Sequence, residues 1–167
     1  MKADNYIKDM VYAASDGIVT TFAVVAGVVG AQLGEATIVI IGLASLFADG
    51  FSMASSDFLA TKSEHEVMAR EGNADLPEHH YPFREAAVTF VTFICSGVIP
   101  LIPYLAGYNN FLYAVIATLV ALLIVGVLRA WATGSGMWSS VLLVLFVGSA
   151  SSAIAYAVGA FIRSLAP

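Results

Sequence analysis

Five long apolar stretches separated by short polar breaks dominate this sequence. Each stretch holds about 21 to 25 residues, enough for a helix rising 1.5 Å per residue to cross a hydrocarbon core of about 30 Å. The alternating pattern of a membrane β-barrel is absent from the sequence. The pattern predicts an all-α, polytopic membrane protein, one domain over residues 1–167. Its five transmembrane helices are expected at about residues 11–33, 36–60, 86–106, 110–131 and 138–162.

Composition supports the same class of protein. Hydrophobic residues make up 59% of the chain and charged residues only 11%, against about 25% charged in an ordinary soluble domain. The net charge of −5 argues against a nucleic-acid partner, because such proteins present a basic face. A single cysteine, Cys95, excludes cysteine-rich metal centres.

The distribution of Lys and Arg predicts the orientation in the membrane. Residues 61–85 form the one long polar segment, expected to be a short cytoplasmic loop into which the second helix continues to about residue 70. The positive-inside rule places the N-terminus and this loop in the cytoplasm and the C-terminus outside or in a lumen. Of the seven basic residues, six fall on the cytoplasmic side of this threading: Lys2, Lys8, Lys62, Arg70, Arg84 and Arg129.

Small residues and prolines predict local features of the helices. Gly27 in the first span and Gly159 in the fifth each belong to a four-residue repeat of small side chains, which lets helices approach closely in lipid. Such repeats serve either packing within one protomer or a dimer face. Pro100 and Pro103 are expected to kink the third span.

Three acids within the first two spans carry the chemical information: Asp16, Asp49 and Asp57. An Asp near the centre of a membrane helix costs about 2.5 to 3.5 kcal/mol on insertion scales. The spans contain no interior Lys or Arg to neutralise them. Protons or metal cations are therefore the expected partners of these carboxylates.

Spacing on the second helix sharpens this hypothesis. Ser45, Asp49, Met53 and Asp57 recur every four residues and so form one row. A thioether between two carboxylates is a mixed soft and hard ligand set that suits a transition metal such as Fe²⁺. The tight hairpin between the two helices is expected to bring Asp16 and Asp57 to similar depth, with Asp49 deeper along a path.

The polar loop adds a second group of candidate ligands. Glu64, His65 and Glu66 follow the second span and form a candidate cytoplasmic entrance that gathers cations. A solvated acidic loop explains the same residues equally simply.

Three segments resemble the vacuolar iron transporter family over essentially the whole chain. They read DGIVTTFAVVAGVVGA over residues 16–31, ADGFSMASSDFLATKSE over 48–64 and GVIPLIPYL over 97–105. The resemblance implies a five-helix homodimeric carrier that moves Fe²⁺, often also Mn²⁺, out of the cytosol in exchange for protons.

Residue by residue, the family's first-helix Asp falls on Asp16 and its second-helix Met on Met53. In that family the path runs between protomers. Some relatives have a further acid where this chain has Ser45. Many relatives also insert a cytosolic metal-binding domain between the second and third spans, and the 25 or so residues here are too few for one. The chain is thus expected to be a short form.

Other functions remain alternatives at this stage: a proton-coupled exporter of organic cations, or a non-transporting membrane subunit. An enzyme is not expected, because a membrane di-iron site needs many His and the motifs of an intramembrane aspartyl protease are missing. No prosthetic group is expected. The predicted partners are transition-metal cations, the lipid bilayer and a second copy of the chain, with the plasma membrane favoured over a vacuolar membrane.

Overall fold

A computed structural model describes residues 4–70 and 81–165 of the chain, and these residues are helical with short connections and no strand. The elements are α1 (Asp4–Gly30), α2 (Glu35–Arg70), α3 (Pro82–Gly97), the 3₁₀ turn η1 (Ile99–Leu101), α4 (Ile102–Leu105), α5 (Phe111–Thr133) and α6 (Met137–Leu165). In this part of the chain, five helical segments are long and apolar enough to cross a membrane, with α3, η1 and α4 forming one of them. The predicted all-α class and number of spans are confirmed.

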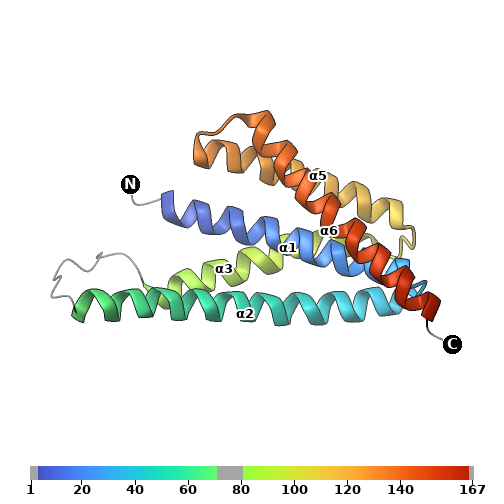
Figure 1. The fold of residues 1–167 in the computed structure, drawn as a ribbon, viewed down its shortest axis with the longest axis horizontal. Helices are drawn as coiled ribbons and strands as arrows, with labels where there is room; N and C mark the ends of the chain where they lie inside the picture. Colours follow the sequence, from blue (N-terminus) through green and yellow to red (C-terminus); the bar gives the residue numbers. More distant parts are fainter. Residues whose placement is uncertain (1–3, 71–80, 166–167) are drawn as a thin grey trace.

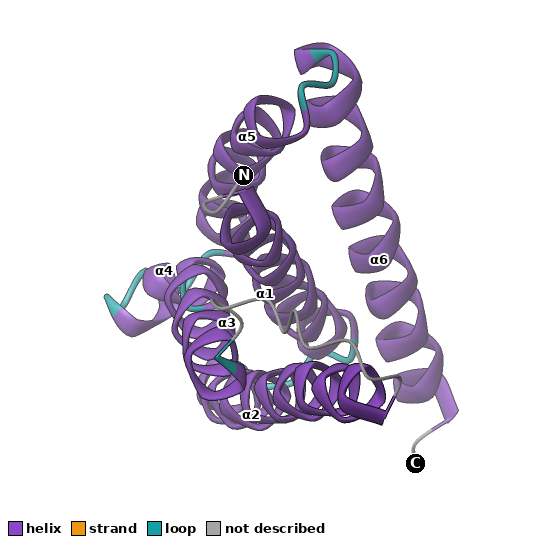
Figure 2. Cartoon of the chain, turned by 90° about the vertical axis from the view of Figure 1, so that its left-hand side faces the viewer, coloured by secondary structure: helices purple, strands orange, loops and turns teal. Residues whose placement is uncertain are grey.

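Helix α1 is the centre of the bundle. It is the most buried of the five spans and contacts α2, α3, α5 and α6, which surround it in an end-on view (Figure 2). Its side chains enter separate apolar clusters along its length, with Val25 in one, Ile18 in the next and Ala13 in the third. A group carried by α1 therefore has a fixed position relative to every other span.

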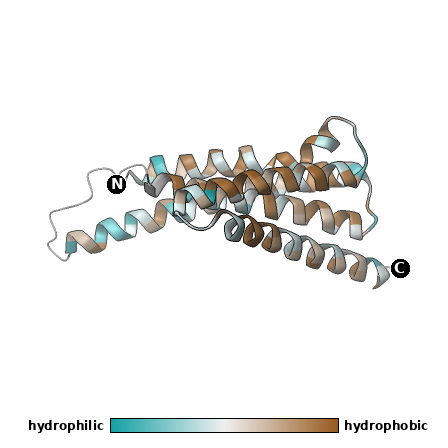
Figure 3. Cartoon of the chain, turned by 90° about the horizontal axis from the view of Figure 1, so that it is seen from above, coloured by the Kyte–Doolittle hydropathy of each residue, from teal (hydrophilic) through white to brown (hydrophobic). Residues whose placement is uncertain are grey.

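The two ends of the bundle differ in polarity. The start of α1 and the end of α2 lie at one end, and the end of α6 lies at the other (Figure 1). Helix α2 runs through Arg70, in agreement with the predicted continuation to about residue 70, and its last described turns form a hydrophilic extension beyond the apolar bundle (Figure 3). The remainder of the predicted loop up to residue 80 lies outside the described residues.

The third span is interrupted rather than only bent. Helix α3 ends at Gly97, η1 contains Pro100, and Pro103 opens the short helix α4. Proline lacks an N–H and its ring clashes with the preceding turn, so two prolines three residues apart break the regular ladder. Both prolines are buried, and the predicted kink is confirmed in this stronger form.

The small-residue repeats pack α1 against α6 inside one protomer. A Cβ at Gly27 would lie 3.4 Å from the Ala155 carbonyl oxygen, and one at Gly159 would meet the Gly27 carbonyl oxygen. Close backbone approach of this kind requires residues without large side chains. Packing within the protomer therefore explains these two repeats.

Candidate metal path

The α1–α2 hairpin places Asp16 beside Asp49. Asp16 lies 14 residues before Gly30, the end of α1, and Asp49 lies 14 residues after Glu35, the start of α2. The connection is short, and Gln32 has a left-handed φ of 54° that turns the chain back. The carboxyl groups of Asp16 and Asp49 interact electrostatically. Asp16 is half-buried, whereas Asp49 is exposed on the surface of the protomer.

Asp57 lies closer to the predicted cytoplasmic end of the bundle than Asp16 and Asp49 do. Its carboxylate accepts a hydrogen bond of 2.8 Å from the Thr89 hydroxyl of α3. Gly17, next to Asp16, packs instead against Phe93 and Gly97, which lie four and eight residues, or about 6 and 12 Å, further along the third span than Thr89. The expectation that Asp16 and Asp57 share one depth is therefore wrong, and Asp49 is the acid level with Asp16.

A second hydrogen bond joins α2 to α3 one turn beyond Asp57. The Thr61 hydroxyl donates to the Glu85 carboxylate at 2.9 Å, and Glu85 is only 7% exposed. Glu85 was missed in the sequence because it lies in the polar segment. The signal was present, since an acid precedes a Thr by four residues on both helices, as Asp57 and Thr61 and as Glu85 and Thr89. Antiparallel packing of the two helices then pairs each acid with the Thr of the other helix.

Met53 lies on the inner side of α2. It is half-buried and packs against the cluster of Ala13, Leu46 and Phe93 from three different helices. Four residues exceed one 3.6-residue turn, so the row from Ser45 to Asp57 winds slowly around α2. The row thus passes from the exposed Asp49 through the packed Met53 to Asp57, which is bound to α3.

The candidate entrance residues are not gathered into one site. Glu64 and Glu66 are exposed, while His65 is half-buried, and its buried Nε2 has no hydrogen-bond partner among the described residues. Over residues 4–70 and 81–165, no group of three or more His, Cys, Asp or Glu side chains is close enough to hold a metal ion. A complete coordination shell would need the main chain, water, Met53 or a second copy of the protein.

The fold and the acids define an integral membrane protein, a five-helix bundle with carboxylates inside its first two spans. A family model described as the VIT family matches residues 7–75 and 66–160. The chain belongs to this family.

Individual relatives agree with this assignment. Vacuolar iron transporter 1 of Eucalyptus grandis is 24% identical over 97% of this chain and 88% of its own length. Vacuolar iron transporter 1 of Oryza sativa is 26% identical over 90% of this chain and 82% of its own length. The vacuolar iron transporter of Toxoplasma gondii is 38% identical over 41% of this chain and 23% of its own length.

These relatives also bear on two expectations. The alignment with the Eucalyptus grandis protein runs over 220 positions, although this chain has 167 residues, so that relative holds residues that this chain lacks. This agrees with the predicted short form. The three relatives are named as vacuolar proteins, so the expected preference for the plasma membrane gains no support from them.

Proposed function

We propose that this protein is a proton-coupled carrier that exports Fe²⁺, and Mn²⁺ by the same path, from the cytosol. The observation that carries the proposal is the pair of carboxylates at one level of the first two spans, Asp16 and Asp49. No Lys, Arg or His occurs between residues 9 and 61 to neutralise them. Acids at such depth are costly and mark ion pathways, and the relatives named as iron transporters favour iron as the ion.

In the proposed path the metal enters beside Glu64, His65 and Glu66 and passes Asp57. It is then held between Asp16 and Asp49, with the Met53 thioether as a soft ligand. Carboxylate oxygens with one thioether suit Fe²⁺ better than Mg²⁺ or Ca²⁺.

Protons drive the cycle because metal and proton compete for the same carboxylate oxygens. Protonation from the acidic side of the membrane releases the metal there, and deprotonation on the cytosolic side restores capture. The coupling is reciprocal, so a bound metal also lowers the affinity of the site for protons.

The proposed active unit is a homodimer that joins at the polar face of α2. Asp49, Ser52 and Ser56 are exposed on one protomer, although they lie on a span long enough to cross the membrane. Polar groups facing hydrocarbon are costly. A second copy related by a two-fold axis covers this face with an identical one, and the two Asp49 residues then line one path.

Metal uptake by proteoliposomes tests this function. Purified protein is reconstituted, Fe²⁺ or Mn²⁺ is added outside, and uptake is followed with and without an acidic interior. We expect uptake of both metals that rises severalfold with the acidic interior. Absence of metal uptake under every gradient would contradict the proposal and favour the alternative of a non-transporting membrane subunit. Uptake of organic cations but not of metals would favour the alternative of a proton-coupled exporter of organic cations.

The same assay distinguishes a metal-binding role of Met53 from a packing role. The variant Met53→Leu keeps the volume of the side chain and removes the sulfur. The matched control is Met137→Leu at the exposed start of α6. We expect slower Fe²⁺ uptake only for Met53→Leu. Equal uptake by both variants would assign Met53 to packing and leave an all-oxygen site.

Cysteine cross-linking tests the proposed dimer. On a Cys95→Ser background, Ser52→Cys places a thiol on the polar face of α2, and Ile124→Cys places one on the exposed face of α5. With a short bifunctional thiol reagent in native membranes, we expect covalent dimers for Ser52→Cys and monomers for Ile124→Cys. The reverse result, or monomers for both variants, would refute an interface through α2.

A further inference from the structure

A pocket unrelated to the metal path lies between α1, α5 and α6. Its volume is about 280 Å³. It is formed by the first turns of α1, the last turns of α5 and the start of α6, at the end of the bundle that holds the N-terminus (Figure 1). Most of its wall is apolar, with Val11 and Val19 on α1 and Leu143, Val144 and Val147 on α6.

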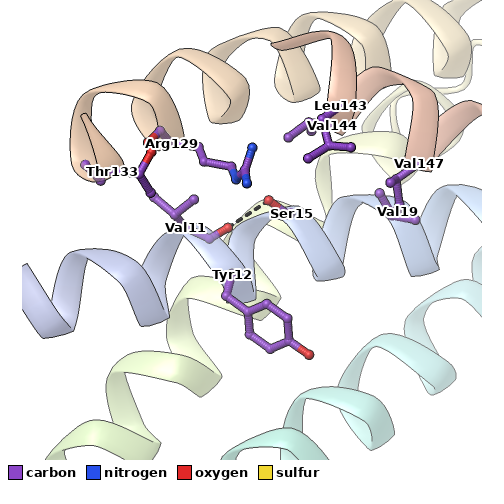
Figure 4. A pocket seen from close by; sticks show the side chains of 10 residues that line it. Val11, Tyr12, Ser15, Val19, Arg129, Thr133, Leu143, Val144 and Val147 are labelled. Carbon is purple, nitrogen blue, oxygen red and sulfur yellow. Dashed lines mark hydrogen bonds between the residues drawn. The ribbon is translucent and has the colours of Figure 1, made fainter. Parts of the chain in front are cut away.

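The pocket contains a cation, Arg129, and no acidic residue among its described lining residues. Arg129 projects from α5 into the pocket, toward α1 (Figure 4), and is half-buried. In the described part of the chain it makes one hydrogen bond, a long one of 3.5 Å to the Ser140 hydroxyl. A guanidinium has five N–H donors, and a partly desolvated charge without a counter-ion is unfavourable.

Hydroxyl groups extend the polar corner beside Arg129. Ser135 and Ser140 lie 2.6 Å apart by their hydroxyl oxygens, and Thr133 and Ser135 lie 2.7 Å apart. Ser140 is buried, whereas Ser135 and Thr133 are exposed. This corner thus combines one fixed cation with hydroxyl donors that can turn toward an anion.

We propose that this pocket binds an anionic phospholipid, with the headgroup phosphate on Arg129 and an acyl chain along the apolar wall. Guanidinium binds phosphate through two parallel hydrogen bonds, and basic pockets between membrane helices are sites for anionic headgroups. A lipid fits better than free phosphate because the valine and leucine side chains match a hydrocarbon tail. The orientation proposed above places the site in the cytoplasmic leaflet.

Native mass spectrometry of the full-length protein with added lipid tests this site. Phosphatidylglycerol is compared with phosphatidylcholine, for the wild type, Arg129→Gln and the matched control Arg163→Gln at the exposed end of α6. We expect phosphatidylglycerol to be retained by the wild type and by Arg163→Gln. Retention is expected to fall about tenfold in Arg129→Gln, equivalent to about 1.4 kcal/mol.

A second variant tests the apolar wall without changing the charge. Leu143→Trp fills the groove from an exposed position and is expected to displace phosphatidylglycerol while Arg129 stays in place. Equal retention of the two lipids by the wild type would overturn the proposal, as would unchanged retention in both Arg129→Gln and Leu143→Trp. If added inorganic phosphate does not displace phosphatidylglycerol from the wild type, the result supports a lipid site. If phosphate binds to Leu143→Trp as well as to the wild type, the result would identify a site for a free anion instead.

Discussion

Replacing Asp16 with Asn is expected to reduce proton-driven Fe²⁺ uptake at least about a hundredfold, because even changes in the hydrogen-bonding shell around metal ligands cost roughly ten- to a hundredfold. Asn keeps the size of the side chain and removes its charge. Asp16 is half-buried on the most central helix and lies level with Asp49, so no other carboxylate of α1 can replace it at that depth. Uptake of Fe²⁺ and Mn²⁺ into acid-loaded proteoliposomes measures the effect.

The matched control is Glu35→Gln, which removes a charge from the exposed first turn of α2 at the far end of the hairpin. It is expected to leave uptake close to that of the wild type. Asp49→Asn provides a second comparison, since the proposed site needs both carboxylates. Wild-type uptake by Asp16→Asn would exclude Asp16 from the path, and an equal loss in Glu35→Gln would indicate a general effect of charge rather than a site.

Periodicity and length predicted the helices but not the depth of the acids. The second apolar stretch was taken to end near residue 60, which placed Asp57 about one turn from the membrane boundary. Helix α2 continues past that point to Arg70, as expected, so the end of the apolar run does not mark the end of the helix and does not set the depth of Asp57. The hairpin is a better reference point for depth, because the four-residue connection fixes the register of the two helices. Counting from it pairs Asp16 with Asp49.

The contacts between α2 and α3 could not be predicted from the pattern of residues along each helix alone. Thr61 and Glu85 are 24 residues apart in sequence, and Asp57 and Thr89 are 32 apart. Such pairs form only once two antiparallel helices adopt a particular register, which side-chain packing decides. Gly50 and Gly97 allow this packing, since Phe93 and Ile94 lie against the first and Leu46 against the second.

Assembly of the site was the least predictable feature. The sequence predicted that Ser45, Asp49, Met53 and Asp57 form one row on α2, but residues four apart wind slowly around a helix with 3.6 residues per turn. The row therefore meets α3 at Asp57 and the outside of the protomer at Asp49. In the proposed dimer a second copy covers Asp49, and the sequence of one chain does not specify the register of that contact.

Replacing Gly17 with Ala is expected to destabilise the protein by about 1 to 3 kcal/mol, the usual cost of forcing an extra methyl group into a packed interior. A Cβ at this position would lie 2.6 Å from the Phe93 carbonyl oxygen and 3.1 Å from the Ser96 hydroxyl. The first of these is a backbone atom of α3, which cannot turn aside as a side chain can. Helix α1 must therefore move away from α3.

Gly34→Ala is the matched control, because nothing lies within 4 Å of a Cβ at that exposed turn residue. The midpoint of thermal unfolding in detergent is expected to fall for Gly17→Ala and to stay unchanged or rise for Gly34→Ala, since Ala also restricts the unfolded chain. Gly17 neighbours Asp16, so movement of α1 also shifts that carboxylate relative to Asp49, and Fe²⁺ uptake is expected to fall with the midpoint. Identical midpoints for the two variants would show that α1 and α3 do not meet at Gly17, and the depth assigned to Asp16 would then lose its main structural support.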